Sequence, residues 1–132
     1  SNGRTYSHYV IHEAAMKFIR DNRAAKKPFF AYLPYTPPHG LFDIPDSDPA
    51  WALYKDKPWS VDARRYAAMV TMLDRQAGEI VALLKELGIE RNTLFIFSGD
   101  NGGADYFVSK EHPRGIHSAN RNPATGVEYR GR

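Results

Sequence analysis

Two short polar stretches of the sequence hold side chains that could bind a metal ion or an anion. Asp100 and Asn101 stand together in the run Ser-Gly-Asp-Asn-Gly-Gly and offer a carboxylate and an amide carbonyl. Such hard oxygen donors suit Ca²⁺ or Mg²⁺, although Ca²⁺ takes about six to eight of them. His39 lies in the run Thr-Pro-Pro-His-Gly, where an imidazole could hydrogen-bond an anion or transfer a proton.

Each of these stretches also has a purely structural interpretation. Asp-Asn-Gly-Gly is a common turn sequence, because these residues tolerate the backbone angles of tight turns. A lone His39 between prolines and a glycine is typical of a surface loop. His8 and His12 have a spacing that can hold a metal on a helix, but no third ligand is indicated. A solvated helix face is therefore the favoured interpretation of these two histidines.

The apolar pattern predicts two helices that would position these side chains. Residues 6–25 show apolar positions at three- and four-residue spacing, which predicts an amphipathic helix with Ser7 as its N-cap. Residues 61–87 carry a longer stripe of the same kind. Ser60 is the predicted N-cap of this second helix, and Gly88 is the predicted stop.

Two short apolar runs, residues 29–33 and 93–97, are typical of strands buried on both faces of a parallel sheet. Residues 34–58 between the helices contain six of the nine prolines and are predicted to be loop. The stretch after Gly103 shows no clear periodicity and is expected to be irregular.

The order of strand, long helix and strand predicts an α/β fold with parallel strands and flanking helices. Ligands of such sheets bind at the carboxyl ends of the strands. The loops that begin after residues 33 and 97 leave the predicted sheet at the same edge. The sequence therefore predicts that His39 lies near Asp100 and Asn101, although some sixty residues separate them.

Composition excludes several classes of protein. The chain has 132 residues, a size typical of one domain, and 42% of them are hydrophobic, which is enough to bury a core. Its net charge of +3 comes from scattered basic residues without interleaved aromatics, so no nucleic-acid partner is expected. No apolar run approaches the roughly 18 residues that cross a membrane. The absence of cysteine excludes disulfides and thiolate chemistry within this sequence.

The ordered combination of segments resembles the arylsulfatase-type sulfatases of the alkaline-phosphatase-like superfamily. Residues 29–39 are similar to the family's "PFF-x-YL…PH" segment, and residues 66–88 look like its long helix. Residues 93–103 match its "NT-x-x-x-x-x-SDNGG" signature, with Gly99 where many members carry another small or polar residue. The resemblance extends over nearly the whole chain, and it implies that the strands belong to a larger sheet.

The resemblance implies a sulfuric ester hydrolase that uses a formylglycine nucleophile and a Ca²⁺ ion, with Mg²⁺ as the alternative metal. Asp100 and Asn101 resemble two of the family's metal ligands. His39 resembles the histidine that contacts the sulfate group of the substrate, and a sulfated carbohydrate is the expected substrate. A periplasmic or extracellular location is expected for the intact enzyme on the same grounds.

Several parts of the family pattern are absent from this sequence. It contains no C/S-x-P-x-R motif, from which formylglycine is made, and no early Asp-Asp pair of metal ligands. It ends at Arg132, in a run that resembles the one before the family's sulfate-binding lysine. We therefore expect residues 1–132 to be a partial catalytic domain that lacks the N-terminal nucleophile segment and the C-terminal part. Such a chain holds no catalytic nucleophile, should be inactive alone, and should self-associate through exposed sheet edges.

Two alternatives stay open at this point. A phosphatase or phosphonate hydrolase of the same superfamily often carries histidine where Asn101 stands here, which favours the sulfatase. The second alternative is a non-enzymatic α/β binding domain in which Asp-Asn-Gly-Gly is only a turn.

Overall fold

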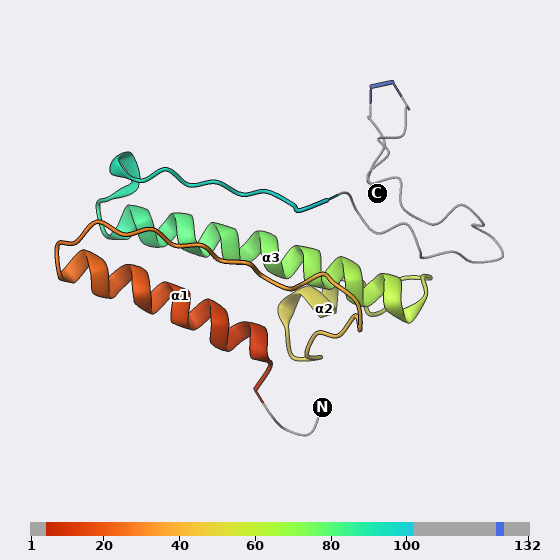
Figure 1. The fold of residues 1–132 in the computed structure, drawn as a ribbon. Coiled ribbons are helices and arrows are strands. Elements are labelled where there is room, and N and C mark those ends of the chain that lie inside the picture. Colours follow the sequence, from red (N-terminus) through yellow and green to blue (C-terminus); the bar gives the residue numbers. More distant parts are fainter. Residues whose placement is uncertain (1–4, 102–123, 126–132) are drawn as a thin grey trace. The chain divides into compact units, whose positions relative to one another are not determined.

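The computed structural model describes residues 5–101 and 124–125 of the chain. It divides into two compact units, Ser1–Phe95 and Ile96–Arg132, and each is described by itself. The first unit contains three α-helices and one short 3₁₀ helix (Figure 1): α1 (Ser7–Ala24), α2 (Pro49–Tyr54), α3 (Val61–Glu86) and η1 (Glu90–Asn92). None of the helices in this part of the chain has the length and apolar character that a membrane span requires.

The ends of the two long helices show which capping predictions were right. The Ser60 hydroxyl accepts a hydrogen bond from the Ala63 backbone N–H at 3.2 Å, which confirms it as the N-cap of α3. Gly88 follows α3 with a φ of +65°, and the two backbone hydrogen bonds of a Schellman motif close the helix there. The predicted cap of α1 was wrong, because Tyr6 occupies that position without a side-chain hydrogen bond and Ser7 is already helical.

The parallel α/β fold expected from the sequence was wrong: residues 5–101 and 124–125 contain no strand. Residues 29–33 and 93–97 are extended, but their backbones form no β ladder within these residues. Their side chains are not buried on both faces either, since Phe30 is 87% exposed and Leu94 is 86% exposed. An apolar, β-prone sequence favours extended backbone, but a strand forms only when another segment completes its hydrogen bonds.

The extended segment 29–36 instead has one covered face. The side chains of Phe29 and Leu33 pack against α1 and α3, whereas those of Phe30 and Tyr32 are exposed. This alternation is the two-residue period of an extended chain that is covered on one side only. The segment returns along the two helices and carries the chain toward the turn that holds His39 (Figure 1).

Helices α1 and α3 run parallel, and side chains along their length meet in the same order (Figure 1). Two apolar clusters pack around α3. The first lies near its N-terminal half and contains Ile44, Ala50, Ala68, Met69 and Met72. The second lies near its C-terminal half and contains Ile19, Ile80, Leu83 and Leu84. The stripe predicted for α3 is confirmed only in part: Met69, Ile80 and Leu84 are buried, whereas Val70 is 43% exposed. The buried side chains of Ala68, Met72 and Leu83 lie outside that stripe.

The face of α1 that packs against α3 agrees with the predicted one at Ala15 and Ile19, which are buried, but differs along the first half of the helix. Val10, Ile11 and Phe18 were expected in the core but are 50%, 47% and 42% exposed. His8 and His12, which were expected on a solvated face, are 3% and 6% exposed. Apolar periodicity misplaced this face because α3 presents polar side chains opposite the first half of α1.

The prediction that the proline-rich region 34–58 is loop was wrong in part, because this region contains the short helix α2. Asp48 begins this helix by accepting a hydrogen bond from the Ala50 N–H at 2.8 Å, and Pro49 follows it. Proline is favourable in the first turn of a helix, where its missing N–H would have no partner in any case.

Candidate functional site

A tight turn at residues 36–39 presents His39 at the surface of the first unit. The His39 N–H donates a hydrogen bond to the Thr36 carbonyl at 3.0 Å, and the Pro37–Pro38 peptide bond is cis. Both side chains at the ends of this turn are exposed. The structure thus leaves the His39 imidazole accessible to a ligand, as its predicted role requires.

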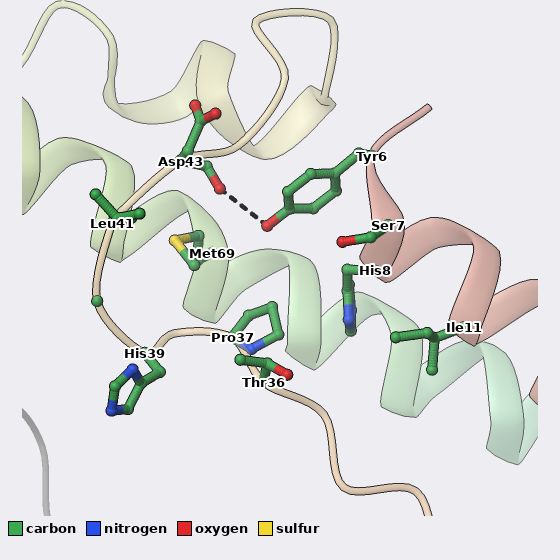
Figure 2. A pocket seen from close by; sticks show the side chains of 11 residues that line it. Tyr6, Ser7, His8, Ile11, Thr36, Pro37, His39, Leu41, Asp43 and Met69 are labelled. Carbon is green, nitrogen blue, oxygen red and sulfur yellow. Dashed lines mark hydrogen bonds between the residues drawn. The ribbon is translucent and has the colours of Figure 1, made fainter. Parts of the chain in front are cut away.

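His39 stands at the rim of a pocket between the N-terminus of α1 and the loop that follows the turn (Figure 2). The pocket has a volume of about 150 Å³. The hydroxyl groups of Ser7 and Thr36 face it, and Pro37, Ile11 and Met69 supply apolar surface. The first helix and the histidine-bearing turn therefore build one pocket from segments that lie some thirty residues apart.

His8 forms part of the wall of this pocket and is held in place by buried contacts. Its Nε2 atom lies 2.6 Å from Oε1 of Gln76 on α3, which makes Nε2 the protonated nitrogen. Its ring packs edge-to-face against Tyr35 at a centroid distance of 4.7 Å. Its Nδ1 atom is buried and has no hydrogen-bond partner. Burial lowers the pKa of His8, so the imidazole in the pocket wall is neutral.

Tyr6 ties the start of α1 to the loop across the pocket. Its hydroxyl donates a hydrogen bond to the Asp43 backbone carbonyl at 2.9 Å (Figure 2). Burial, together with the nearby carboxylates of Asp43 and Asp48, raises the pKa of Tyr6. The Asp43 carboxylate itself points away from the pocket in Figure 2. The pocket therefore combines polar groups with apolar surface and is not dominated by charged groups.

A second polar group lies between α1, α3 and the start of α2. Arg75 donates two hydrogen bonds to Asp48, at 3.0 and 2.8 Å, and the Tyr9 hydroxyl donates a third at 2.5 Å. The Asp48 side chain is only 1% exposed. Burial opposes its ionisation, but these bonds and that from the Ala50 N–H together keep the pKa of Asp48 below its usual range. This group is saturated with internal bonds, which is typical of a structural role.

His12 joins this group and is not the solvated residue that had been predicted. Its Nε2 lies 2.8 Å from Glu79, and its Nδ1 lies 2.7 Å from the Tyr35 hydroxyl. The described residues contain no cluster of three or more metal-ligating side chains, so His8 and His12 complete no metal site there. The polar pair Gln76 and Glu79 within the stripe of α3 was the sequence signal that could have revealed their burial.

Asp100 and Asn101, the predicted metal ligands, lie in the second unit. Both are exposed at a bend, so their oxygens are accessible, and the donor types fit a hard cation. A Cβ atom at Gly99 would lie 3.1 Å from the Asn101 carbonyl oxygen, so a larger residue there would require a small adjustment of this bend. His39 belongs to the first unit, so its predicted proximity to Asp100 stays a prediction. Gly102, Gly103 and the irregular stretch predicted after them lie outside the described residues, apart from 124–125.

Known proteins are similar to this chain over most of its length. The family model described as Sulfatase matches residues 2–126. An endo-4-O-sulfatase of Bacteroides thetaiotaomicron is 38% identical over 61% of the chain, and a sulfatase of Formosa agariphila is 37% identical over 71%. The dog N-acetylgalactosamine-6-sulfatase is 31% identical over 72% of the chain.

The matched region makes up 19%, 19% and 16% of these three relatives, so the chain spans less than a fifth of their length. No solved structure matches the chain significantly. The family match covers far more than half of the chain and confirms the resemblance seen in the sequence motifs. The chain therefore belongs to the sulfatase family.

Proposed function

We propose that this chain forms part of the catalytic domain of an enzyme that hydrolyses sulfate esters of carbohydrates. Family membership over residues 2–126 is the observation that carries this proposal. The name of one relative, N-acetylgalactosamine-6-sulfatase, contains a sugar, which supports a carbohydrate as the substrate class. The pocket beside His39, with its mixture of hydroxyl groups and apolar surface, is compatible with that choice.

In this proposal His39 binds the sulfate group of the substrate. Its side chain is exposed on a hydrogen-bonded turn at the rim of a pocket, where an imidazole N–H can donate to a sulfate oxygen. The turn fixes the backbone on either side of His39, which limits the positions that the imidazole can take.

Asp100 and Asn101 would hold a Ca²⁺ ion, or Mg²⁺, through their side-chain oxygens. A bound cation supplies electrostatic stabilisation of negative charge on the sulfate oxygens. Two donors fill only part of a calcium shell of about six to eight oxygens, so further ligands must come from outside this chain. The formylglycine nucleophile must do so as well, because no C/S-x-P-x-R motif is present.

The phosphatase and phosphonate hydrolase alternative is weakened by the family match and by Asn101. An amide at this position offers a neutral oxygen, whereas those enzymes often place a histidine there for a second metal. The non-enzymatic alternative is weakened by the same match, because it extends over both predicted ligand loops. We further propose that the intact enzyme acts in the periplasm or outside the cell.

The test is sulfate release by the full-length protein that contains this chain, measured with 4-nitrophenyl sulfate and with a sulfated monosaccharide. His39→Ala and Asp100→Ala should each lower kcat/KM by about a hundredfold, because one lost group that stabilises developing charge commonly has that effect. Lys57→Ala, at an exposed residue on another surface, should leave activity unchanged. Hydrolysis of 4-nitrophenyl phosphate but of neither sulfate ester, or wild-type activity of both variants, would contradict the proposal.

The isolated chain provides a separate test, since it should show no turnover of either substrate. Calorimetry with CaCl₂ should detect at most weak binding, because the chain supplies only two side-chain ligands. The exposed apolar side chains of segments 29–33 and 93–97 should also make it self-associate as concentration rises. Submillimolar calcium binding that Asp100→Ala abolishes would show that the isolated chain holds a more complete site.

A further inference from the structure

The pocket beside His39 offers hydroxyl groups and apolar surface to a ligand. The Ser7 hydroxyl points into the space beside Tyr6 and Met69 (Figure 2). The Thr36 hydroxyl lies on the opposite wall, and the Pro37 ring forms an apolar face between them. A sugar ring has the matching chemistry, with hydroxyl groups at its edge and C–H groups on its faces.

The N-terminus of α1 adds backbone N–H groups to the same wall. The first turn of this 18-residue helix has no side-chain cap and contains no acidic residue. The Tyr9 N–H already donates to the Tyr6 carbonyl, so within this turn the N–H groups of Ser7 and His8 are the ones without an acceptor in the helix. A helix N-terminus alone would not indicate a site, but here it coincides with a pocket and with the unpartnered nitrogen of His8.

That nitrogen indicates which kind of group the wall accepts. Nε2 of His8 donates to Gln76, so Nδ1 carries a lone pair and can only accept a hydrogen bond while the ring is neutral. Lone-pair acceptors bind hydroxyl groups and repel anions. A buried acceptor without a partner is costly. Nδ1 has almost no accessible surface, so a ligand hydroxyl reaches it only after a small shift of the pocket wall, and that bond removes the cost.

We propose that this pocket is the subsite for the sugar ring that carries the sulfate ester, with Ser7 and Thr36 binding its hydroxyl groups. The inference rests on the proposed sulfatase function, because His39 then holds the sulfate at the rim of the same pocket. Its volume of about 150 Å³ suits a single ring, not an oligosaccharide. The residues that select a carbohydrate ester over an aryl ester are thus Ser7 and Thr36.

The first experiment is an NMR titration of the 132-residue chain with methyl β-galactoside, which lacks sulfate. We expect a dissociation constant on the order of 1 mM, which ligands of this size commonly reach. Ser7→Ala and Thr36→Val should each weaken binding about fivefold, the effect of one lost neutral hydrogen bond. Ser47→Ala, an equally exposed serine at the other polar group, is the matched control and should bind normally. Circular dichroism shows whether each variant keeps its helices.

Three results would overturn the subsite. These are the absence of galactoside binding by a wild-type chain that is folded and monomeric in the sample, binding by Ser7→Ala and Thr36→Val that equals wild-type binding, and chemical-shift changes with sodium sulfate but not with the galactoside. The last result would make the pocket an anion site. None of these measurements depends on sulfatase activity, so the subsite can fail while the proposed function stands.

The second experiment uses the full-length enzyme and compares two substrates. Ser7→Ala and Thr36→Val should lower kcat/KM for a sulfated monosaccharide about fivefold each, and leave that for 4-nitrophenyl sulfate unchanged. An equal loss with both substrates would assign the two residues to the fold and would overturn the proposal. Absence of activity on either substrate in the wild-type enzyme would instead refute the proposed function.

Discussion

The buried carboxylate of Asp48 should contribute far more to stability than the nearby carboxylate of Asp46. Both aspartates pair with an arginine on α3, and they are only two residues apart. The Asp46 side chain is 77% exposed, whereas that of Asp48 is 1% exposed and receives hydrogen bonds from Arg75, Tyr9 and the Ala50 N–H. Changing each aspartate to asparagine removes the charge and keeps the size.

The expected magnitude follows from these contacts. Asparagine is also a good N-cap, so Asp48→Asn should keep the start of α2 and lose mainly the charged pair. Removing one partner of a buried ion pair costs about 3–5 kcal/mol, but Arg75 is 35% exposed and keeps Glu79 at 3.5 Å. We therefore expect a loss of ~2–3 kcal/mol, against at most ~0.5 kcal/mol for the exposed Asp46→Asn.

Urea unfolding followed by circular dichroism at pH 7 measures both effects. With a slope of roughly 1.5 kcal/mol per molar for a small protein, Asp48→Asn should lower the midpoint by about 1–2 M urea. Asp46→Asn should shift it by less than about 0.4 M by the same conversion. Equal shifts for the two variants would refute the view that burial and the four hydrogen bonds to Asp48 set its contribution.

Three other predictions follow from local structure. Burial keeps the pKa of His8 below its usual 6.5, so the folded chain binds fewer protons at this residue than the unfolded chain does. The urea midpoint should therefore fall as pH drops below about 6.5, and His8→Leu should reduce this dependence of the midpoint on pH. Gly88→Ala should destabilise the chain by ~1 kcal/mol, because Gly88 has a φ of +65°. Gly78→Ala should stabilise the chain by ~0.5 kcal/mol, because this glycine lies on an exposed helical site with no atom near the new Cβ. Urea midpoints measure both effects. In the full-length protein, with every other reactive cysteine replaced, spin labels at His39→Cys and Asp100→Cys should lie within about 20 Å by electron paramagnetic resonance, a span of two label arms around one shared site. A much longer distance would end the shared-site hypothesis.

Local signals in the sequence were sufficient to predict the two long helices, α1 and α3, but not the short helix α2. The stripe and caps of α3 depend on residues close together in the chain, so Ser60 and Gly88 were identified correctly. The family signature likewise depends on short motifs, and the family match confirms it. The position of His39 on an accessible turn also agrees with the proline-rich sequence around it.

Features that depend on distant partners could not be predicted in the same way. Residues 29–33 and 93–97 have the composition of strands, but pairing requires a neighbouring segment, and the described residues supply none. His8 and His12 were assigned to the wrong face because their burial depends on Gln76 and Glu79, nearly seventy residues away. The buried pair of Asp48 and Arg75 escaped prediction for the same reason.

The polar side chains of Gln76 and Glu79 in the middle of α3 affect how the two parallel helices are aligned. Apolar contacts are tolerant of sliding, and a shift of α1 by one turn would still bring apolar surface together. That shift would, however, move His8 away from Gln76 and leave polar atoms facing methyl groups of Met72 or Ile80. Misaligned packing would bury several unsatisfied donors at once. The hydrogen bonds of the α1 histidines thus favour a single register of α1 along α3. This register fixes where the N-terminus of α1 meets the histidine-bearing turn.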